Sequence, residues 1–230
     1  MNCWDLADAA VRAGATRLLL WGPPGIGKSR WALDVLSGGR QYPPVRVYLN
    51  QDLTAQELLG HWVPKGSVFQ WHHGPVAWAW LHGTGLVVDE IGRASGPVLD
   101  LFLAVLDDPE TARITLPSGE EIRPAPSFAA VATSNNPPED LDPALQDRFD
   151  AVLYVNEPSP ALVSRLNGVL KGLGDVIRDS YADPERAISP RRALAFAKFL
   201  KAGMKPKVAA SLAFGERAED VLSALKLAGV

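Results

Sequence analysis

One glycine-rich turn is the most informative part of this 230-residue chain, and it runs Gly22-Pro23-Pro24-Gly25-Ile26-Gly27-Lys28-Ser29. The turn matches the pattern G-x-x-x-x-G-K-[ST], in which glycines let backbone N–H groups point at phosphate oxygens. An apolar run at 17–21 precedes it and a helix-forming run at 29–36 follows it, which disfavours a plain Gly/Pro turn with an incidental lysine. We therefore expect a nucleotide here, with Lys28 on the β- and γ-phosphates and Ser29 on Mg²⁺.

A second apolar run, at 85–89, ends in the neighbouring carboxylates Asp89 and Glu90. Asp89 would hold Mg²⁺ directly or through water, and Glu90 would polarise the attacking water. An apolar run that ends in acids is a weak signal alone, because many strands end this way. The phosphate-binding turn upstream strengthens it, so we expect both acids in the nucleotide site.

A polar side chain also closes the apolar run at 128–132. Asn135 follows this run, at the end of a strand where α/β sheets bind ligands, and would hold the lytic water or the γ-phosphate. Taken alone, however, Asn135 is better explained by an Asx turn that leads into Pro137.

Two arginines have both a functional and a plain interpretation. Arg148 ends a short helix expected at 143–148, and in isolation it is best explained by a surface ion pair with Asp147 or Asp150. Arg191 follows a Ser-Pro helix start, from which it would reach a phosphate; the alternative is solvation of the helix start.

Strands and helices alternate through the longer, N-terminal part of the chain. Strands are expected at 17–21, 45–49, 85–89, 128–132 and 151–155, and helices at 29–36, 54–59, 98–106 and 143–148. This alternation predicts an α/β domain with a parallel five-stranded sheet flanked by helices. We place the domain at 1–156, with β-hairpin insertions near 60–75 and 112–124.

The C-terminal part differs in pattern and in charge. Residues 1–155 contain 11 Lys+Arg and 18 Asp+Glu, whereas residues 156–230 contain 12 and 8. Apolar residues recur at helical spacing in 161–170, 192–200 and 218–227. We therefore expect a small, basic, α-helical domain at 157–230.

Composition excludes several classes of protein. With 47% hydrophobic residues, 21% charged residues and a net charge of −3, the chain is neither a disordered tail nor a strongly basic nucleic-acid binder. A single cysteine, Cys3, excludes a disulfide framework and a multi-cysteine metal site. The acidic N-terminus does not resemble a targeting peptide, and glycine, proline and histidine interrupt the uncharged segment 66–88. We therefore expect a cytoplasmic protein without a membrane span.

Histidine and tryptophan are concentrated at 61–82, which holds all four histidines and four of the seven tryptophans. A metal site is not expected, because two of the histidines are adjacent and no cysteine or aspartate accompanies them. We expect Trp78 and Trp80 to pack in a helix. The tip of the first hairpin is expected to be exposed and to contact a client through Trp62, Lys65, Phe69 or Trp71.

In their order along the chain, these motifs resemble those of the AAA+ ATPases, from about Trp4 to the C-terminal helices. The branch they resemble is the MoxR-type, dynein-related one. Its hairpin within the second helix matches 58–76, and its hairpin before the first sensor strand matches 113–123. The resemblance implies a P-loop AAA+ fold with a C-terminal helical lid.

The resemblance also assigns roles to the motifs. Walker A is 22–29, Walker B is Asp89-Glu90, sensor 1 is Asn135, the arginine finger offered to a neighbouring subunit is Arg148, and sensor 2 is Arg191. Because Asn136 and Arg192 repeat the residue types of their neighbours, sensor 1 could also be Asn136 and sensor 2 could also be Arg192.

The function that the resemblance implies is Mg²⁺-dependent ATP hydrolysis by a ring, usually a hexamer, with active sites between subunits. It also implies remodelling of a protein partner, often one with a von Willebrand factor A domain. Two alternatives stay open. A helicase or loader acting on nucleic acid is permitted by the basic C-terminal part and disfavoured by the acidic body. The other is an ATP-dependent switch with low turnover.

Overall fold

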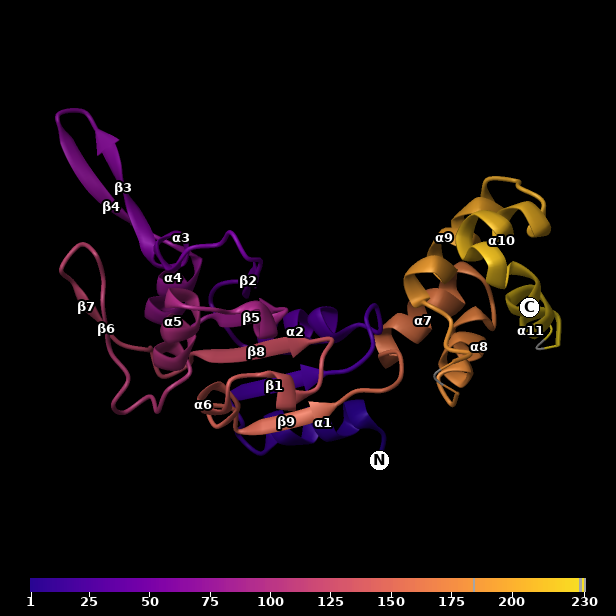
Figure 1. Cartoon of the computed structure of the whole chain (residues 1–230), viewed down its shortest axis with the longest axis horizontal. Helices are drawn as coiled ribbons and strands as arrows, with labels where there is room; N and C mark the ends of the chain where they lie inside the picture. The colour runs from indigo at the N-terminus through magenta and orange to yellow at the C-terminus, as the bar shows by residue number, and fades with distance from the viewer. Residues whose placement is uncertain (184, 228, 230) are drawn as a thin grey trace. The chain divides into compact units, whose positions relative to one another are not determined.

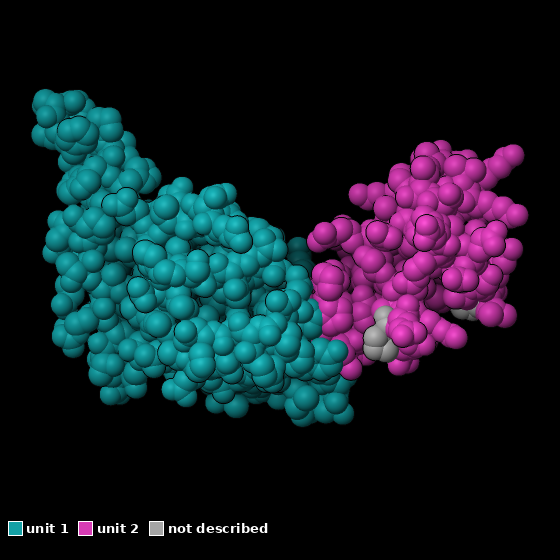
Figure 2. All heavy atoms as spheres, viewed as in Figure 1, with its two compact units in different colours: residues 1–22, 29–154 teal, residues 23–28, 155–230 magenta. Residues whose placement is uncertain are grey.

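The computed structural model of this chain describes residues 1–183, 185–227 and 229. It forms two compact units, which Figure 2 shows in teal and magenta. Unit 1 contains Met1–Gly22 and Ser29–Tyr154, and unit 2 contains Pro23–Lys28 and Val155–Val230. The chain passes from one unit to the other after Tyr154, close to the boundary expected at 156, but the glycine-rich turn groups with the C-terminal helices.

Unit 1 is built on a parallel, five-stranded sheet (Figure 1). Its strands are β1 (Arg17–Trp21), β2 (Val45–Tyr48), β5 (Gly85–Asp89), β8 (Ala129–Ser134) and β9 (Ala151–Tyr154). They lie in the order β2-β5-β8-β1-β9, so the expected α/β fold is confirmed. β5 and β8 are buried along their whole length, as central strands between two helical layers should be, whereas the edge strands expose Tyr48 and Tyr154.

The fourth strand of this sheet is longer at its carboxyl end than the expected 128–132. β8 continues to Ser134, because its last residues pair with β1 in the register Trp21↔Ser134. Thr133 and Ser134 are therefore buried strand residues, each 3% exposed. Asn135 follows directly after the end of the strand.

Helices cover both faces of the sheet. Those of unit 1 are α1 (Cys3–Arg12), α2 (Lys28–Ser37), α3 (Ala55–Leu59), α4 (Pro75–His82), α5 (Pro97–Val105) and α6 (Pro143–Gln146), with the 3-10 turns η1 (Ile91–Arg93) and η2 (Pro138–Asp140). Trp80 of α4 and Phe102 of α5 share one core cluster with Leu86 of β5. Strand side chains alternate in direction, and on the opposite face the rings of Trp4 and Trp31 lie 6.1 Å apart.

Two antiparallel hairpins extend from unit 1 (Figure 1). β3 (Gly60–Lys65) pairs with β4 (Val68–His73) between α3 and α4, and β6 (Ile114–Thr115) pairs with β7 (Glu121–Ile122) before β8. The first hairpin leaves Trp62 50% and Phe69 70% exposed, whereas Trp80 in the following helix is fully buried.

Beyond Tyr154, the described residues of unit 2 form helices and no strand. The helices are α7 (Pro160–Val169), α8 (Leu173–Ser180), α9 (Pro190–Lys201), α10 (Pro206–Phe214) and α11 (Ala218–Leu227), with the 3-10 turn η3 (Gly215–Arg217). Their core includes Leu166, Phe196 and Phe214, and burial beside it raises the pKa of Tyr181 to about 12. Nowhere among the described residues is there a helix long and apolar enough to span a membrane.

Candidate nucleotide site

Asp89 is the buried centre of a polar cluster at the carboxyl ends of the strands. It is the last residue of β5 and is 3% exposed. Its Oδ1 accepts hydrogen bonds from Ser29 Oγ at 2.5 Å and from Thr133 Oγ1 at 2.9 Å. Ser29 lies in the first turn of α2 and Thr133 near the end of β8, so three elements meet at this carboxylate.

A guanidinium group contacts the other oxygen of Asp89. Nε and Nη2 of Arg46 each lie 2.5 Å from Asp89 Oδ2. Arg46 of β2 is in register with Val87, so its long side chain reaches along the shared face of the sheet to the end of β5. Arg46 was not among the residues expected at this site. The sequence shows Arg46 as one charged residue inside an apolar strand. It does not show which strand lies next to β2, so the contact with Asp89 could not be inferred.

Glu90 is held in an unusual backbone conformation directly after β5. Its φ of 60° and ψ of 49° lie in the left-handed region, and it is the only described non-glycine residue with positive φ. Such residues cluster at functional sites, at a cost of about 1–3 kcal/mol each. The Glu90 N–H donates to Thr133 Oγ1 at 3.4 Å, and the Glu90 carboxylate accepts a hydrogen bond from Asn135 Nδ2.

The two neighbouring asparagines make different interactions. The side-chain amide of Asn135 donates to Glu90 Oε1 from the next strand. Asn136 instead uses its backbone, which donates to Ser134 Oγ at 3.0 Å and accepts from the same hydroxyl at 2.7 Å. Asn135 is therefore the asparagine whose side chain contacts Glu90.

The glycine-rich turn belongs to unit 2. Gly25 and Gly27 have φ values of 81° and 107°, which L side chains rarely adopt. A Cβ on Gly27 would lie 2.6 Å from Ser159 Oγ, and the Ser159 N–H donates to the Ile26 carbonyl at 2.8 Å. Lys28 is 6% exposed, and its Nζ donates to the Pro23 carbonyl at 2.9 Å. The turn is therefore closely packed on the start of α7, with the ammonium group over its own backbone.

The start of α9 lies beside the same turn within unit 2. A Cβ on Gly25 would be 3.9 Å from Oγ of Ser189, the residue before α9. Arg191 and Arg192 are both exposed in the first turn of this helix. Both arginines therefore lie at this helix start, and the geometry does not indicate which of them would be sensor 2.

Arg148 is bound by residues of its own unit. Its Nη1 lies 3.4 Å from Asp107 Oδ1, and its Nε donates to the Leu103 carbonyl at 3.3 Å. The expected ion pair with Asp147 or Asp150 is wrong, because Arg148 pairs with Asp107 and Asp150 is bound to Arg17 at 2.6 Å. Arg148 turns instead toward the end of α5, and 32% of its side chain is exposed.

The comparison with protein families identifies this arrangement. Residues 17–149, more than half of the chain, match the model described as the AAA domain of the dynein-related subfamily. This chain belongs to that family. The match confirms the expected resemblance to the MoxR-type, dynein-related branch of the AAA+ ATPases.

Curated relatives and solved structures agree with the AAA assignment. Protein NorQ of Paracoccus denitrificans (strain Pd 1222) is 32% identical over 169 residues, which cover 70% of this chain and 61% of NorQ. Protein CbbQ of Hydrogenophilus thermoluteolus is 27% identical over 164 residues, which cover 68% of this chain and 59% of CbbQ. The chain therefore spans about 60% of the length of these relatives. A mutant of RuvB from Thermotoga maritima shares the fold, with a TM-score of 0.55, 17% identity, and coverage of 98% of this chain and 68% of that chain.

The residues of the candidate nucleotide site suit ATP bound together with Mg²⁺. The hydroxyl of Ser29 and the carboxylate of Asp89 are hard oxygen ligands of the kind that Mg²⁺ prefers. The glycine backbone and the buried Lys28 suit phosphate oxygens. When bound, the metal would neutralise the charge that develops on the transferred phosphate. In the part of the chain that the structure describes, no group of three or more His, Cys, Asp and Glu forms another metal site.

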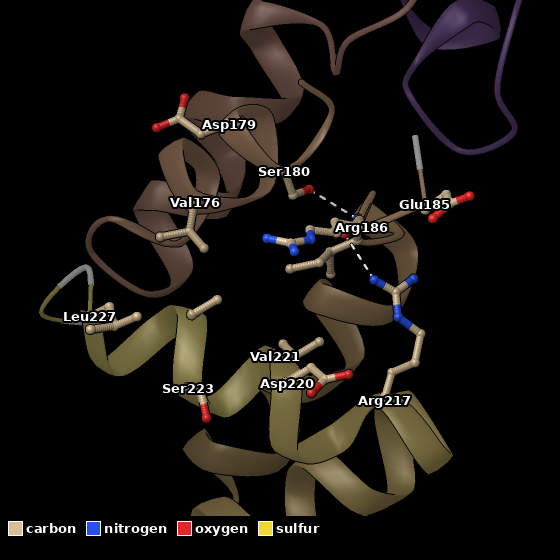
Figure 3. A pocket seen from close by; sticks show the side chains of 12 residues that line it. Val176, Asp179, Ser180, Glu185, Arg186, Arg217, Asp220, Val221, Ser223 and Leu227 are labelled. Atoms are coloured by element: carbon tan, nitrogen blue, oxygen red, sulfur yellow. Dashed lines mark hydrogen bonds between the residues drawn. The ribbon is translucent and has the colours of Figure 1, made fainter. Parts of the chain in front are cut away.

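A separate pocket of about 850 Å³ lies in unit 2 (Figure 3). It is lined by α8, α11 and the segment that precedes α9, with apolar residues and charges of both signs. Arg217 supports one wall by donating to the carbonyls of Arg186 at 2.8 Å and Ala187 at 3.0 Å. None of the sequence-predicted site residues is among those that line the pocket, so we do not place the AAA nucleotide site there.

Proposed function

We propose that this chain hydrolyses ATP with Mg²⁺, in a ring of its own copies, to remodel a protein partner. One observation carries the proposal: two neighbouring carboxylates have separate sets of partners. Asp89 contacts hydroxyl groups, whereas Glu90 contacts the amide of Asn135. This separation supports a division of roles, with Asp89 for the metal and Glu90 for water.

The chemistry assigned to each residue follows from its functional group. The Glu90 side chain accepts the proton of the attacking water. Asn135 cannot accept a proton there, so it orients the carboxylate. Lys28 and the N–H groups of the turn hold the β- and γ-phosphates, and Arg191 or Arg192 contacts phosphate from the start of α9.

Assembly would complete the site. An arginine finger supplied by a second subunit contributes about 10³–10⁵ in rate to related hydrolases. Arg148 suits this role because it is a partly exposed guanidinium group just after the short helix α6 of the α/β unit. A ring of six copies is the assembly that the AAA+ resemblance favours, and a single copy would then be almost inactive.

The remodelling role requires a surface that contacts the partner. The β3–β4 hairpin supports such a role, because it exposes Trp62, Val68 and Phe69 together. Aromatic side chains are favoured at the centres of protein interfaces. A protein with a von Willebrand factor A domain is the partner class we would test first.

The proposal is tested by ATP turnover per subunit from nanomolar to tens of micromolar protein, with assembly followed by light scattering. We expect turnover to rise steeply with concentration and to be lost in Arg148→Ala, which should still assemble. Arg30→Ala is the matched control, since Arg30 forms an exposed ion pair with Asp34 on α2.

Turnover that does not depend on concentration would contradict catalysis between subunits. ATP binding without turnover at any concentration would favour a switch instead of a motor. Absence of ATP binding would contradict the whole proposal.

A further inference from the structure

The contact between Arg46 and Asp89 joins the edge strand of the sheet to the metal-binding carboxylate. Both guanidinium nitrogens that face Asp89 lie 2.5 Å from Oδ2. The hydroxyl groups of Ser29 and Thr133 donate to Oδ1. Each oxygen of Asp89 is therefore engaged, one by neutral hydroxyl donors and the other by a full positive charge.

The two side chains differ strongly in burial. The Asp89 side chain is 4% exposed, whereas that of Arg46 is 52% exposed. A carboxyl group buried to this degree needs a partner, because its desolvation is costly. Arg46 supplies the partner from a long side chain that can move into solvent while Asp89 stays fixed by Ser29 and Thr133.

A guanidinium group and a divalent cation cannot both lie close to Oδ2 at low cost, since their like charges repel beside a carboxyl group that is almost fully buried. Arg46 and the metal therefore compete for one carboxylate. Competition of this kind makes nucleotide and metal binding depend on the position of Arg46.

We propose that Arg46 is a positioning residue that holds Asp89 oriented before nucleotide binds, and that it leaves Oδ2 when ATP binds with Mg²⁺. This inference rests on the proposed function, because it takes Asp89 as the residue that faces the metal. Arg46 then sets how strongly Mg²⁺ increases nucleotide affinity. Its withdrawal also changes the charge at the exposed edge of the sheet each time nucleotide binds.

The test compares nucleotide affinity with and without Mg²⁺ and needs no turnover. The Kd of the non-hydrolysable analogue AMP-PNP is measured by titration calorimetry in EDTA and in excess Mg²⁺. The Kd in EDTA is divided by the Kd in Mg²⁺, and this ratio is compared between variants. In Arg46→Gln we expect the ratio to rise about tenfold, within the usual range of coupling between two ligands, while the Kd in EDTA stays the same.

Two further variants control the result. Arg46→Lys keeps the charge but not the two-nitrogen contact, so its ratio should lie between those of the wild type and Arg46→Gln. Arg30→Gln removes an arginine of the same unit that pairs with an exposed carboxylate at 2.9 Å, and its ratio should equal that of the wild type. Thermal unfolding of each variant without ligand shows that it is folded.

Three outcomes would overturn the inference. An unchanged ratio in Arg46→Gln would mean that Arg46 does not compete with the metal. A weaker Kd in EDTA would mean that Arg46 contacts the nucleotide itself. If Arg46→Gln does not fold, a wild-type ratio in Arg46→Lys overturns the inference in the same way. A wild-type chain that binds no AMP-PNP at all would instead contradict the proposed function on which the inference rests.

Discussion

Side chains at the carboxyl ends of β5 and β8 contact one another across strands, whereas the β3–β4 hairpin exposes its aromatic side chains. Asp89 is bound by residues from three other elements and is 3% exposed. Phe69, near the hairpin turn, is 70% exposed, and Trp62 contacts Trp71 of its own hairpin with ring centroids 5.4 Å apart. The first region has a geometry fixed by the whole fold, so its substitutions should change chemistry. In the second region, Trp62 and Phe69 are exposed and lie outside the core cluster, so their substitutions should change only what the chain contacts.

The largest expected effect tests the first half of this contrast. Glu90→Gln keeps the size of the side chain and removes its ability to accept a proton. We expect ATP turnover to fall about 10²–10⁴-fold while the Kd for ATP changes little. Glu139→Gln, an exposed glutamate of η2, is the control and should behave like the wild type. Turnover within a few fold of the wild type would remove Glu90 from the chemistry.

A pair of threonines separates chemistry from packing. Thr133→Val removes the buried hydroxyl that donates to Asp89 and accepts from Glu90. Thr84→Val removes an equally buried hydroxyl, which donates to the carbonyls of Tyr42 and Pro43. Both variants should lose about 1–3 kcal/mol of unfolding free energy in denaturant titrations.

Only the Thr133 variant should also lose turnover, by about tenfold, which corresponds to ~1.4 kcal/mol in the barrier. Equal turnover in the two variants would mean that the hydroxyl of Thr133 is structural only.

Asp150 is as interlocked as Asp89 but lies at the opposite, amino ends of the strands. Burial acts to raise its pKa, but hydrogen bonds from Arg17 and Thr16 hold that pKa below the ordinary value. A depressed folded-state pKa stabilises the fold above the unfolded-state value and loses that contribution as pH falls through the folded value.

Asp150→Asn should therefore cost about 1–2 kcal/mol of unfolding free energy at pH 7, a figure reduced for partial exposure. The difference from wild type should shrink below about pH 4, and turnover at pH 7 should stay the same. Unfolding free energies of both proteins across this pH range check the prediction. A difference that grows toward acid would contradict the sign of the shift.

The smallest expected effect belongs to the hairpin. Phe69→Ser should change the unfolding free energy by less than about 0.5 kcal/mol and leave basal ATP turnover unchanged. For comparison, Trp80→Ala in the adjoining helix, where the side chain is fully buried, should cost about 3–5 kcal/mol. Denaturant titrations and turnover assays measure both. A large loss of turnover in Phe69→Ser would break the contrast between the two regions.

The sequence was most informative about structural features that leave a pattern in neighbouring residues. The glycine-rich turn and the pair Asp89 and Glu90 were predicted because a strand, a turn and a helix leave periodic signals in neighbouring residues. The five strands were predicted for the same reason. The exact end of β8 was not, because the pairing of Trp21 with Ser134 depends on a strand far away in the sequence.

The residues that contact the site residues could not be predicted from the sequence, for a physical reason. Arg46 reaches Asp89 because β2 lies next to β5, and Arg148 meets Asp107 because the end of α5 lies against the segment after α6. Neither neighbour follows from periodicity. The contact between Asn135 and Glu90 likewise depends on the direction of a side chain, which spacing does not give.

The backbone of Glu90 has a consequence for anyone who engineers this chain. A residue with a bulky side chain and positive φ is strained, and glycine or asparagine adopts a φ of 60° more readily. Replacing Glu90 with either residue is therefore expected to stabilise the fold. A screen for thermal resistance alone would select Glu90→Gly early and would remove the carboxylate that the proposed hydrolysis needs. Selection for heat tolerance and selection for turnover should therefore diverge first at this position.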